Sequence, residues 1–142
     1  MKKIILLICS SLIVTLTCDA QLQYQVLTDS TEHNAKMLRG IIDKSDLTSD
    51  TAFSWYAESQ RIYPHPDSAA VAAFRNNKDS IYFLIFGGTW CMDTHFVLPK
   101  FYKIEEAAGF PEDHVTVFAV DHHMSTIGNM ARVMHVRNTP TI

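Results

Sequence analysis

Residues 81–94 read IYFLIFGGTWCMDT and join a strand-like run to the start of a helix. The part that ends at Phe86 is apolar and rich in aromatic and β-branched side chains, which is typical of a strand buried on both faces. A pair of glycines ends that run, and a helical pattern begins at Asp93. The stretch therefore predicts a strand, a tight turn and a helix, with Cys91 at the junction.

The segments after this junction continue the alternation of helix and strand. The helix from Asp93 contains Pro99, which should kink it, and closes at Gly109. Residues 114–121 (HVTVFAVD) then predict a second buried strand, and residues 125–136 predict a further helix. Apolar side chains at helical spacing in that last helix are expected in the core: Ile127, Met130, Ala131 and Met134.

A helix is also predicted before the quoted stretch, over residues 68–78, where Asp67 or Ser68 can cap it. The order helix, strand, helix, strand, helix predicts an α/β layered sheet with flanking helices and with parallel strands around the crossover. In such sheets the working site lies at the carboxyl ends of the strands, which is where Cys91 is expected.

Residues 21–66 form an N-terminal extension to this pattern. Residues 22–27 (LQYQVL) predict a short strand, and residues 51–63 predict a short amphipathic helix that PHPD ends. Its aromatic side chains are expected to pack in the core: Trp55, Tyr56 and Tyr63. The sequence assigns the extension no role of its own.

Length and charge restrict the class of protein. The chain has 142 residues, 47% of them hydrophobic, and a formal net charge of −3. This length is enough for one domain with a core and too short for two. The 12 Lys and Arg residues are scattered, so no basic patch favours a nucleic acid as partner.

Residues 1–20 have the pattern of a secretory signal peptide. A positive start (MKK) is followed by an almost unbroken apolar run, and Cys18 and Ala20 occupy the small-x-small positions. Cleavage after Ala20 predicts a periplasmic or secreted protein. The alternative is a lipid anchor on Cys18, although Thr17 fits a lipoprotein box poorly. The apolar run is short for a membrane span, so none is expected.

Cleavage would also remove two of the three cysteines, Cys9 and Cys18. Cys91 would then be the one cysteine of a chain sent to an oxidising compartment. No internal disulfide is therefore expected.

The position of Cys91 favours a reactive thiol. Unpaired N–H groups and the helix dipole at a helix N-terminus favour the thiolate and lower the thiol pKa. Thr94 can donate its hydroxyl to the sulfur, and His95, on the same helical face, would favour the thiolate if protonated. Asp93 would raise the thiol pKa, or would simply favour the helix start. The alternative for Cys91 is a small buried apolar side chain.

Four motifs in order resemble the thioredoxin-like superfamily. The central strand and W-C-x-x-C site of that family resemble IYFLIFGGTWCMDT, and Pro99 lies where thioredoxins carry a helix-kinking proline. Its next strand resembles VTVFAVD, and its cis-proline loop resembles NTPTI. The likeness covers roughly residues 67–142 and is nearest to secreted bacterial thioredoxin-family proteins with a W-C-x-D-T site.

The resemblance implies a role for each matching residue. Cys91 would be the nucleophile, with Trp90 as its flanking aromatic side chain. Pro140 would be the cis-proline, and Thr139 would offer backbone groups to a bound thiol peptide. Asp93 and His95 are secondary candidates for the same site.

The sequence departs from the family pattern at three points. Thr94 stands in place of the resolving cysteine, so the usual internal disulfide cycle is closed to this protein. Ile85 replaces the buried acid that assists the resolving thiol. Only Thr141 and Ile142 follow the cis-proline motif, so the C-terminal hairpin and helix are missing and the chain is expected to be a fragment.

The predicted function is thiol-disulfide exchange of the thioredoxin type with a single nucleophilic cysteine. Its partners would be protein disulfides or small thiols, with an external thiol as reductant, and no cofactor is expected. One alternative is a non-catalytic thioredoxin-fold binding module for thiol or peptide partners. Another is a carrier of copper or zinc that uses Cys91, Asp93 and His95 with His122 or His123.

Overall fold

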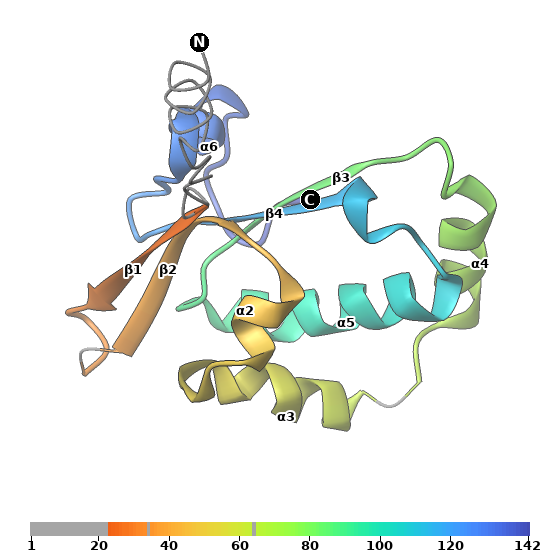
Figure 1. Cartoon of the computed structure of the whole chain (residues 1–142), viewed down its shortest axis with the longest axis horizontal. Coiled ribbons are helices and arrows are strands. Elements are labelled where there is room, and N and C mark those ends of the chain that lie inside the picture. The colour runs from red at the N-terminus through yellow and green to blue at the C-terminus, as the bar shows by residue number, and fades with distance from the viewer. Residues whose placement is uncertain (1–22, 34, 64) are drawn as a thin grey trace, which may run out of the picture.

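The computed structural model describes residues 23–33, 35–63 and 65–142, and Figure 1 shows their arrangement. The predicted signal peptide, with Cys18, lies outside these residues. The described part is a mixed α/β fold with a four-stranded sheet and five α-helices. The α/β class predicted from the order of elements is therefore confirmed.

The sheet has the strand order β1-β2-β4-β3. Its strands are β1 (Tyr24–Asp29), β2 (Ala35–Ile42), β3 (Phe83–Gly87) and β4 (Val115–Ala119). β1 and β2 form an antiparallel hairpin and β2 pairs antiparallel with β4, whereas β3 and β4 are parallel. The parallel pair predicted around the crossover is thus present, and the extension over residues 21–66 supplies two strands of the same sheet.

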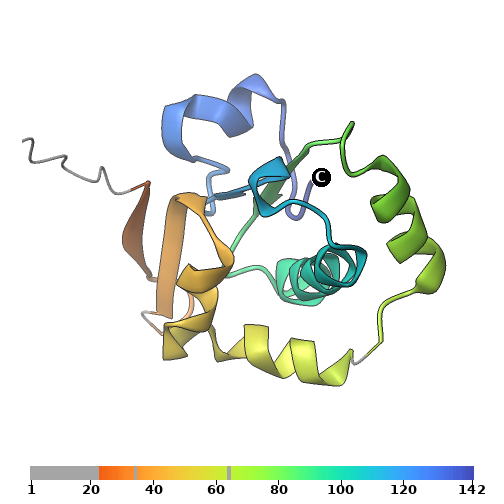
Figure 2. The same ribbon diagram turned by 45° about the vertical axis from the view of Figure 1, so that its right-hand side comes forward.

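The helices of the described chain are α2 (Lys44–Thr48), α3 (Ser54–Ile62), α4 (Ser68–Asn77), α5 (Met92–Ala108) and α6 (Met130–Val133). Figure 2 shows α5 nearly end-on, with α3 and α4 beside it and α6 on the other side of the sheet. Asp67 caps α4 by accepting a hydrogen bond from the Ala70 N–H at 2.8 Å. α5 contains Pro99 and ends at Gly109, whose φ of 61° suits a glycine.

The two faces of the sheet bury separate apolar clusters. The cluster against α5 includes Leu38, Ile85, Phe101, Val117 and Ala119. The cluster against α6 consists of Phe86, Phe118, Val120 and Ala131. Because successive strand side chains point to opposite faces, neighbours such as Ile85 and Phe86 belong to different clusters. The end of β3 is therefore held from both sides.

The expectation of a strand buried on both faces is wrong for the first half of β3. Leu84 exposes 37% of its surface, and only the last three residues of the strand are buried. The reason is that β3 is an edge strand of the described sheet, so its first half has a neighbour on one side only.

The helix predicted over residues 125–136 is much shorter in the structure. A 3₁₀ turn (Ile127–Asn129) leads into α6, which has four residues. Gly128 has a φ of 62° in this turn, and such left-handed backbone interrupts a helix. Of the four side chains predicted to form a buried stripe, only Ala131 is fully buried.

The helix predicted over residues 51–63 is present as a 3₁₀ turn (Thr51–Phe53) followed by α3. Tyr56 is buried, as predicted, whereas Trp55 and Tyr63 are half-buried. Within the residues that the structure describes, no helix is long and apolar enough to cross a membrane.

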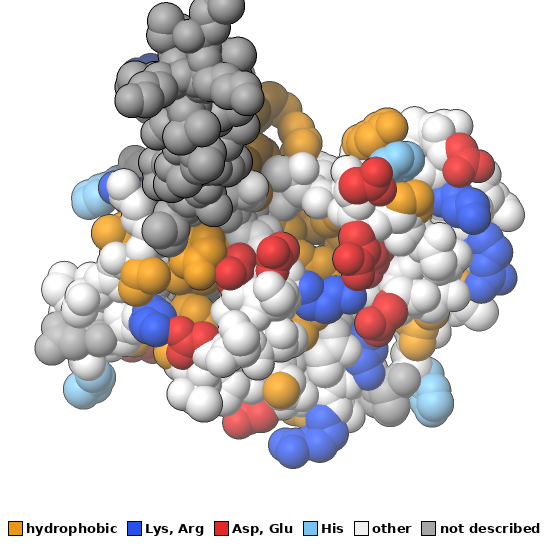
Figure 3. All heavy atoms as spheres, viewed as in Figure 1, with side chains coloured by type: hydrophobic (Ala, Val, Ile, Leu, Met, Phe, Trp, Pro, Cys, Tyr) orange, Lys and Arg blue, Asp and Glu red, His pale blue; other side chains and the backbone are white. Residues whose placement is uncertain are grey.

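Charges of both signs are interspersed on the face shown in Figure 3. Ion pairs are also present among the described residues: the Nζ of Lys44 lies 3.4 to 3.8 Å from three carboxylates, those of Glu105, Glu106 and Glu112. The described residues on this face therefore form no basic patch of the kind that nucleic acids bind.

Candidate functional site

Cys91 is the residue at which α5 begins. Its backbone is extended (φ −91°, ψ 121°), and its carbonyl accepts the first helical hydrogen bond, from the His95 N–H at 3.0 Å. Its own N–H donates to the Gly88 carbonyl at 2.9 Å and closes a turn between β3 and α5. The thiol is partly exposed. It therefore lies at the carboxyl end of β3, where the free N–H groups of a helix start converge.

Two glycines let this turn pack closely. A Cβ on Gly87 would lie 2.9 Å from Cγ2 of Thr94, and a Cβ on Gly88 would lie 2.7 Å from the indole of Trp90. Both distances are shorter than van der Waals contact, so a larger residue would displace one of these side chains. The glycine pair is thus needed by the two side chains that flank Cys91.

The last residues of the chain return to the thiol. The Thr139–Pro140 peptide bond is cis, and the Thr139 carbonyl oxygen lies 3.5 Å from Cys91 Sγ. Thr141 fixes this loop against β3 by exchanging two backbone hydrogen bonds with Phe86, of 2.8 and 2.9 Å. The loop predicted to hold the cis-proline and the predicted nucleophile therefore meet.

The pKa of the Cys91 thiol lies below the ordinary value for a cysteine. Burial raises this pKa, but donor groups around the sulfur, the hydroxyls of Thr139 and Thr94 and the N–H groups of Thr94 and Asp93, favour the thiolate and together lower it by more. The Thr139 carbonyl acts in the opposite sense, because it can accept only from the protonated thiol. The net result is a larger fraction of thiolate than in a free cysteine.

Thr94 connects the turn to the sulfur. Its side chain is buried, with 1% of its surface exposed, and its Oγ1 accepts a hydrogen bond from the Gly88 N–H at 3.2 Å. A hydroxyl that accepts in this way still has its own hydrogen to donate, and that hydrogen favours the Cys91 thiolate. Thr94 therefore links the turn after β3 to the thiol through a hydroxyl that favours the thiolate.

Trp90 lies between the end of β4 and a histidine that follows this strand. Its Nε1 donates to the Val120 carbonyl at 2.9 Å, and its ring faces that of His122 with the centroids 4.0 Å apart. His122 in turn is hydrogen-bonded to the buried carboxylate of Asp29, at 2.7 Å. The hydroxyl of Thr31 and the ring of His122 lower the pKa of Asp29 to about 2, so Asp29 is an anion.

His95 does not serve as a cation beside the sulfur. Its ring stacks on Trp55, with the centroids 3.9 Å apart, and its Nε2 donates to the Thr89 carbonyl at 2.7 Å. Burial lowers the pKa of His95 by more than the Thr89 carbonyl raises it, so the ring is neutral at neutral pH. His95 is thus held by Trp55 and by the Thr89 carbonyl, and its neutral ring places no positive charge beside the sulfur.

Asp93 is exposed in the first turn of α5, where a carboxylate favours the helix start. Its backbone N–H, rather than its carboxylate, contributes to the lowered pKa of Cys91. Among the described residues, no three side chains of His, Cys, Asp or Glu gather as metal ligands would. Asp93 and His95 thus form no metal site with Cys91 in the described structure.

The β1–β2 hairpin contacts both loops of the site. The Leu38 N–H donates to Oγ1 of Thr89 at 3.1 Å, in the turn that precedes Cys91. Arg39 donates to Asp121 at 3.0 Å, at the end of β4. The extension, which the sequence left without a role, therefore positions the loops that follow β3 and β4.

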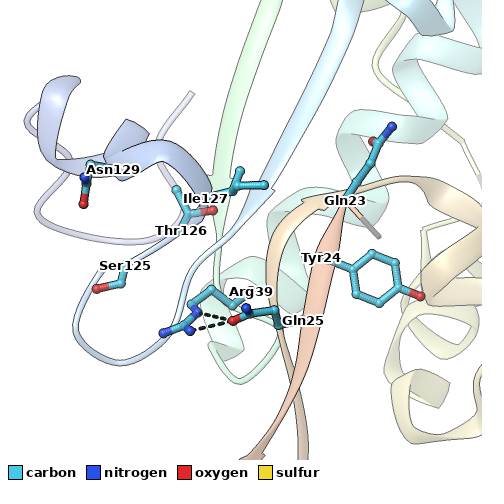
Figure 4. Close-up of a pocket in the computed structure, with 8 residues that line it drawn as sticks. All are labelled: Gln23, Tyr24, Gln25, Arg39, Ser125, Thr126, Ile127 and Asn129. Atoms are coloured by element: carbon cyan, nitrogen blue, oxygen red, sulfur yellow. Dashed lines mark hydrogen bonds between the residues drawn. The ribbon is translucent and has the colours of Figure 1, made fainter. Parts of the chain in front are cut away.

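A separate hollow of about 360 Å³ lies next to Arg39, and Figure 4 shows the residues around it. They are mostly polar: Gln23, Tyr24, Gln25, Arg39, Ser125, Thr126, Ile127 and Asn129. The Arg39 guanidinium is already occupied by Gln25, at 2.6 Å, and by Asp121. None of the predicted site residues lines this hollow.

Sequence reasoning missed Asp29, Thr31 and Thr89, and it considered His122 only as a further ligand in the alternative of a metal carrier. Asp29 and His122 are 93 positions apart, so no local motif joins them. One signal was available: His122 follows a strand at the carboxyl edge, by the same rule that located Cys91. The partner of His122 depends on the β1–β2 hairpin, which no local pattern places.

Comparison of the chain with protein-family models, curated proteins and solved structures finds no match.

Proposed function

We propose that the protein carries out thiol-disulfide exchange as a monothiol member of the thioredoxin-like superfamily, with Cys91 as nucleophile. One observation carries the proposal: Cys91 Sγ lies at a helix start, 3.5 Å from the backbone of Thr139. A partly exposed thiol with a lowered pKa thus lies beside main-chain groups that an extended peptide could pair with.

The proposed reaction begins with the Cys91 thiolate, which attacks one sulfur of a partner disulfide. A bond forms between Cys91 and that sulfur, the partner's S–S bond breaks, and the second sulfur leaves as a thiolate that takes a proton from water. Thr94 offers no second thiol, so an external thiol must attack the mixed disulfide. That attack returns Cys91 as a thiolate and leaves the partner in a disulfide with the external thiol.

The likeness of residues 67–142 to thioredoxin-like domains supports this assignment. The signal-like pattern of residues 1–20 supports a periplasmic or secreted site of action, where protein disulfides are common. A lipid anchor on Cys18 is the alternative, and it would hold the same chemistry at a membrane surface.

A second candidate is a binding module that turns nothing over. Met92 and Phe96 are 75% and 51% exposed and lie one turn apart at the start of α5, beside the thiol. Exposed apolar side chains of this kind suit an apolar peptide, whose binding needs no bond to the sulfur.

The two candidates differ in their dependence on the sulfur of Cys91. The purified protein would be incubated with a synthetic peptide that contains one disulfide, quenched with an alkylating agent and separated without reductant. The redox proposal expects an adduct that dithiothreitol releases and that Cys91→Ser abolishes. Equal peptide binding by wild type and Cys91→Ser, with no adduct, would favour the binding module.

A further inference from the structure

Asp29 is a buried carboxylate whose two oxygens have different partners. Oδ1 accepts hydrogen bonds from the N–H and the hydroxyl of Thr31, at 2.8 and 2.6 Å. Oδ2 faces Nε2 of His122 at 2.7 Å. Because an ionised carboxylate only accepts hydrogen bonds, Nε2 carries the hydrogen, and the orientation of the His122 ring is fixed by an anion that Thr31 holds in place.

The fixed ring of His122 packs against the indole of Trp90 and restricts the orientation of that indole. The two rings are 4.0 Å apart with their planes inclined by 36°, and the indole N–H is fixed on the Val120 carbonyl. The backbone of Gly88 blocks a second direction of movement, since a Cβ there would lie 2.7 Å from the indole. Trp90, the residue before Cys91, is therefore held by His122, by Gly88 and by the end of β4.

The other charged groups near His122 are engaged elsewhere. Asp121, which precedes it, accepts from Arg39 at 3.0 Å and from the His123 and Ser125 N–H groups at 2.9 Å. Asp29 is thus the carboxylate that acts on His122. The His122 side chain is 34% exposed. Its contact with Trp90 therefore orients the indole more than it shields the indole from water.

We propose that Asp29 and His122 are positioning residues that hold the Trp90 indole as one wall of the thiol site, so that a partner disulfide reaches Cys91 in a productive orientation. This inference rests on the proposed redox function. It also gives the β1–β2 hairpin a role in that function, because Asp29 ends β1.

The contact between His122 and Trp90 can be measured without any redox activity. Trp55→Phe leaves Trp90 as the remaining one of two tryptophans and removes the indole that stacks on His95. Emission of the remaining indole depends on its surroundings, so the Trp90 spectrum at a fixed neutral pH reports whether the His122 ring still packs against it. In this background His122→Gln should let the indole move and shift its emission, Asp29→Asn should cause a smaller shift, and His123→Gln should cause none.

The positioning role is tested by comparing two reactions of Cys91. Adduct formation with the peptide disulfide should be about three- to tenfold slower in His122→Gln and Asp29→Asn, because a displaced wall misorients the partner. Alkylation by iodoacetamide, a small reagent that needs no docking, should change by less than about twofold. His122 is partly exposed, so His122→Gln keeps the test valid if the buried Asp29→Asn variant does not fold.

The outcomes separate this inference from the function on which it rests. A Trp90 emission spectrum that His122→Gln leaves unchanged would overturn the ring contact. A shifted spectrum with adduct rates equal to wild type would overturn the positioning role alone. If the wild-type protein forms no adduct while the emission results are as expected, the proposed redox function fails, and the positioning role fails with it although the ring contact stands.

Discussion

The sulfur of Cys91 is influenced by groups from two separated parts of the chain. Thr94 and the first N–H groups of α5 are its neighbours in sequence, whereas Thr139 arrives from 48 positions away. Burial alone would make the thiol less acidic, and the hydrogen bonds reverse this effect. The acidity of the Cys91 thiol thus depends on the folding of the Thr139 loop back against it.

The first prediction concerns the acidity of Cys91. Its rate of alkylation by iodoacetamide should rise with pH around a midpoint below about 8.5, the value for a free cysteine. Thr94→Val keeps the shape and removes the hydroxyl that favours the thiolate, so its midpoint should be higher. Because the folded state has the lower pKa, ionisation of Cys91 adds stability at high pH, and this contribution disappears as the pH falls through the folded-state value.

N-acetylcysteine, measured in the same buffers, is the reference for this experiment. A wild-type midpoint at or above that of the reference would show that burial outweighs the hydrogen bonds. An unchanged midpoint in Thr94→Val would remove Thr94 from the set of groups that stabilise the thiolate.

The second prediction concerns the space beside Trp90. Gly88→Ala adds a Cβ that would lie 2.7 Å from the indole, so the ring must move or the turn must open. We expect a loss of about 1–3 kcal/mol in the free energy of unfolding in urea, together with a shift in Trp90 emission. Gly109→Ala is the control: its φ of 61° makes alanine unfavourable, but nothing lies within 4 Å of the added Cβ. It should lower stability without changing that emission.

Elements with a signal at their own ends could be predicted from the sequence. The α4 helix begins after its predicted cap, Asp67, and α5 ends at Gly109 as expected. The secondary-structure predictions that failed did so for physical reasons that the spacing of apolar residues does not reveal. Gly128 interrupts the helix predicted over residues 125–136. The strand β2 was not predicted because its burial does not alternate regularly, since the neighbours Met37 and Leu38 are both buried.

The third prediction concerns Glu105, a buried side chain of α5 that is 2% exposed. Burial raises its pKa, the Lys44 charge lowers it by less, and its Oε2 has no hydrogen-bond partner among the described residues. Because the raised pKa belongs to the folded state, its stabilising contribution is complete below the ordinary value near 4.5 and is lost as the pH rises through the folded-state value.

Glu105→Gln removes the buried charge and keeps the shape. Its free energy of unfolding at pH 7 should equal or exceed that of wild type by about 1 kcal/mol, and the difference should shrink as the solution becomes acidic. Urea unfolding at a series of pH values measures this difference. Glu106→Gln is the control, since it removes a 69% exposed partner of the same Lys44 and should change the free energy of unfolding at pH 7 by less than about 0.5 kcal/mol. A large loss of stability in Glu105→Gln at pH 7 would mean that its ion pair with Lys44 dominates.

For the whole molecule, the sequence predicted the α/β class and the edge of the sheet at which the thiol lies. It could not predict how the extension and the rest of the chain come together. The hydrogen bond between Asp29 and His122 joins positions 93 apart, and the bond between Leu38 and Thr89 joins positions 51 apart. Such contacts follow from the register of the hairpin on β4, which depends on the packing of the complete sheet.

The bond between the Leu38 N–H and the Thr89 hydroxyl makes one amide of the sheet dependent on a loop. The Leu38 amide hydrogen should exchange with deuterium when the turn beside Cys91 opens. The Ile41 amide, which is bonded to the Gln23 carbonyl at 2.8 Å, should exchange when the hairpin opens. Thr89→Val should accelerate exchange at Leu38 and leave Ile41 unchanged. Parallel exchange at both amides in wild type and variant would contradict this. The rate of deuterium uptake at the Leu38 amide of β2 therefore measures how often the turn beside Cys91 opens.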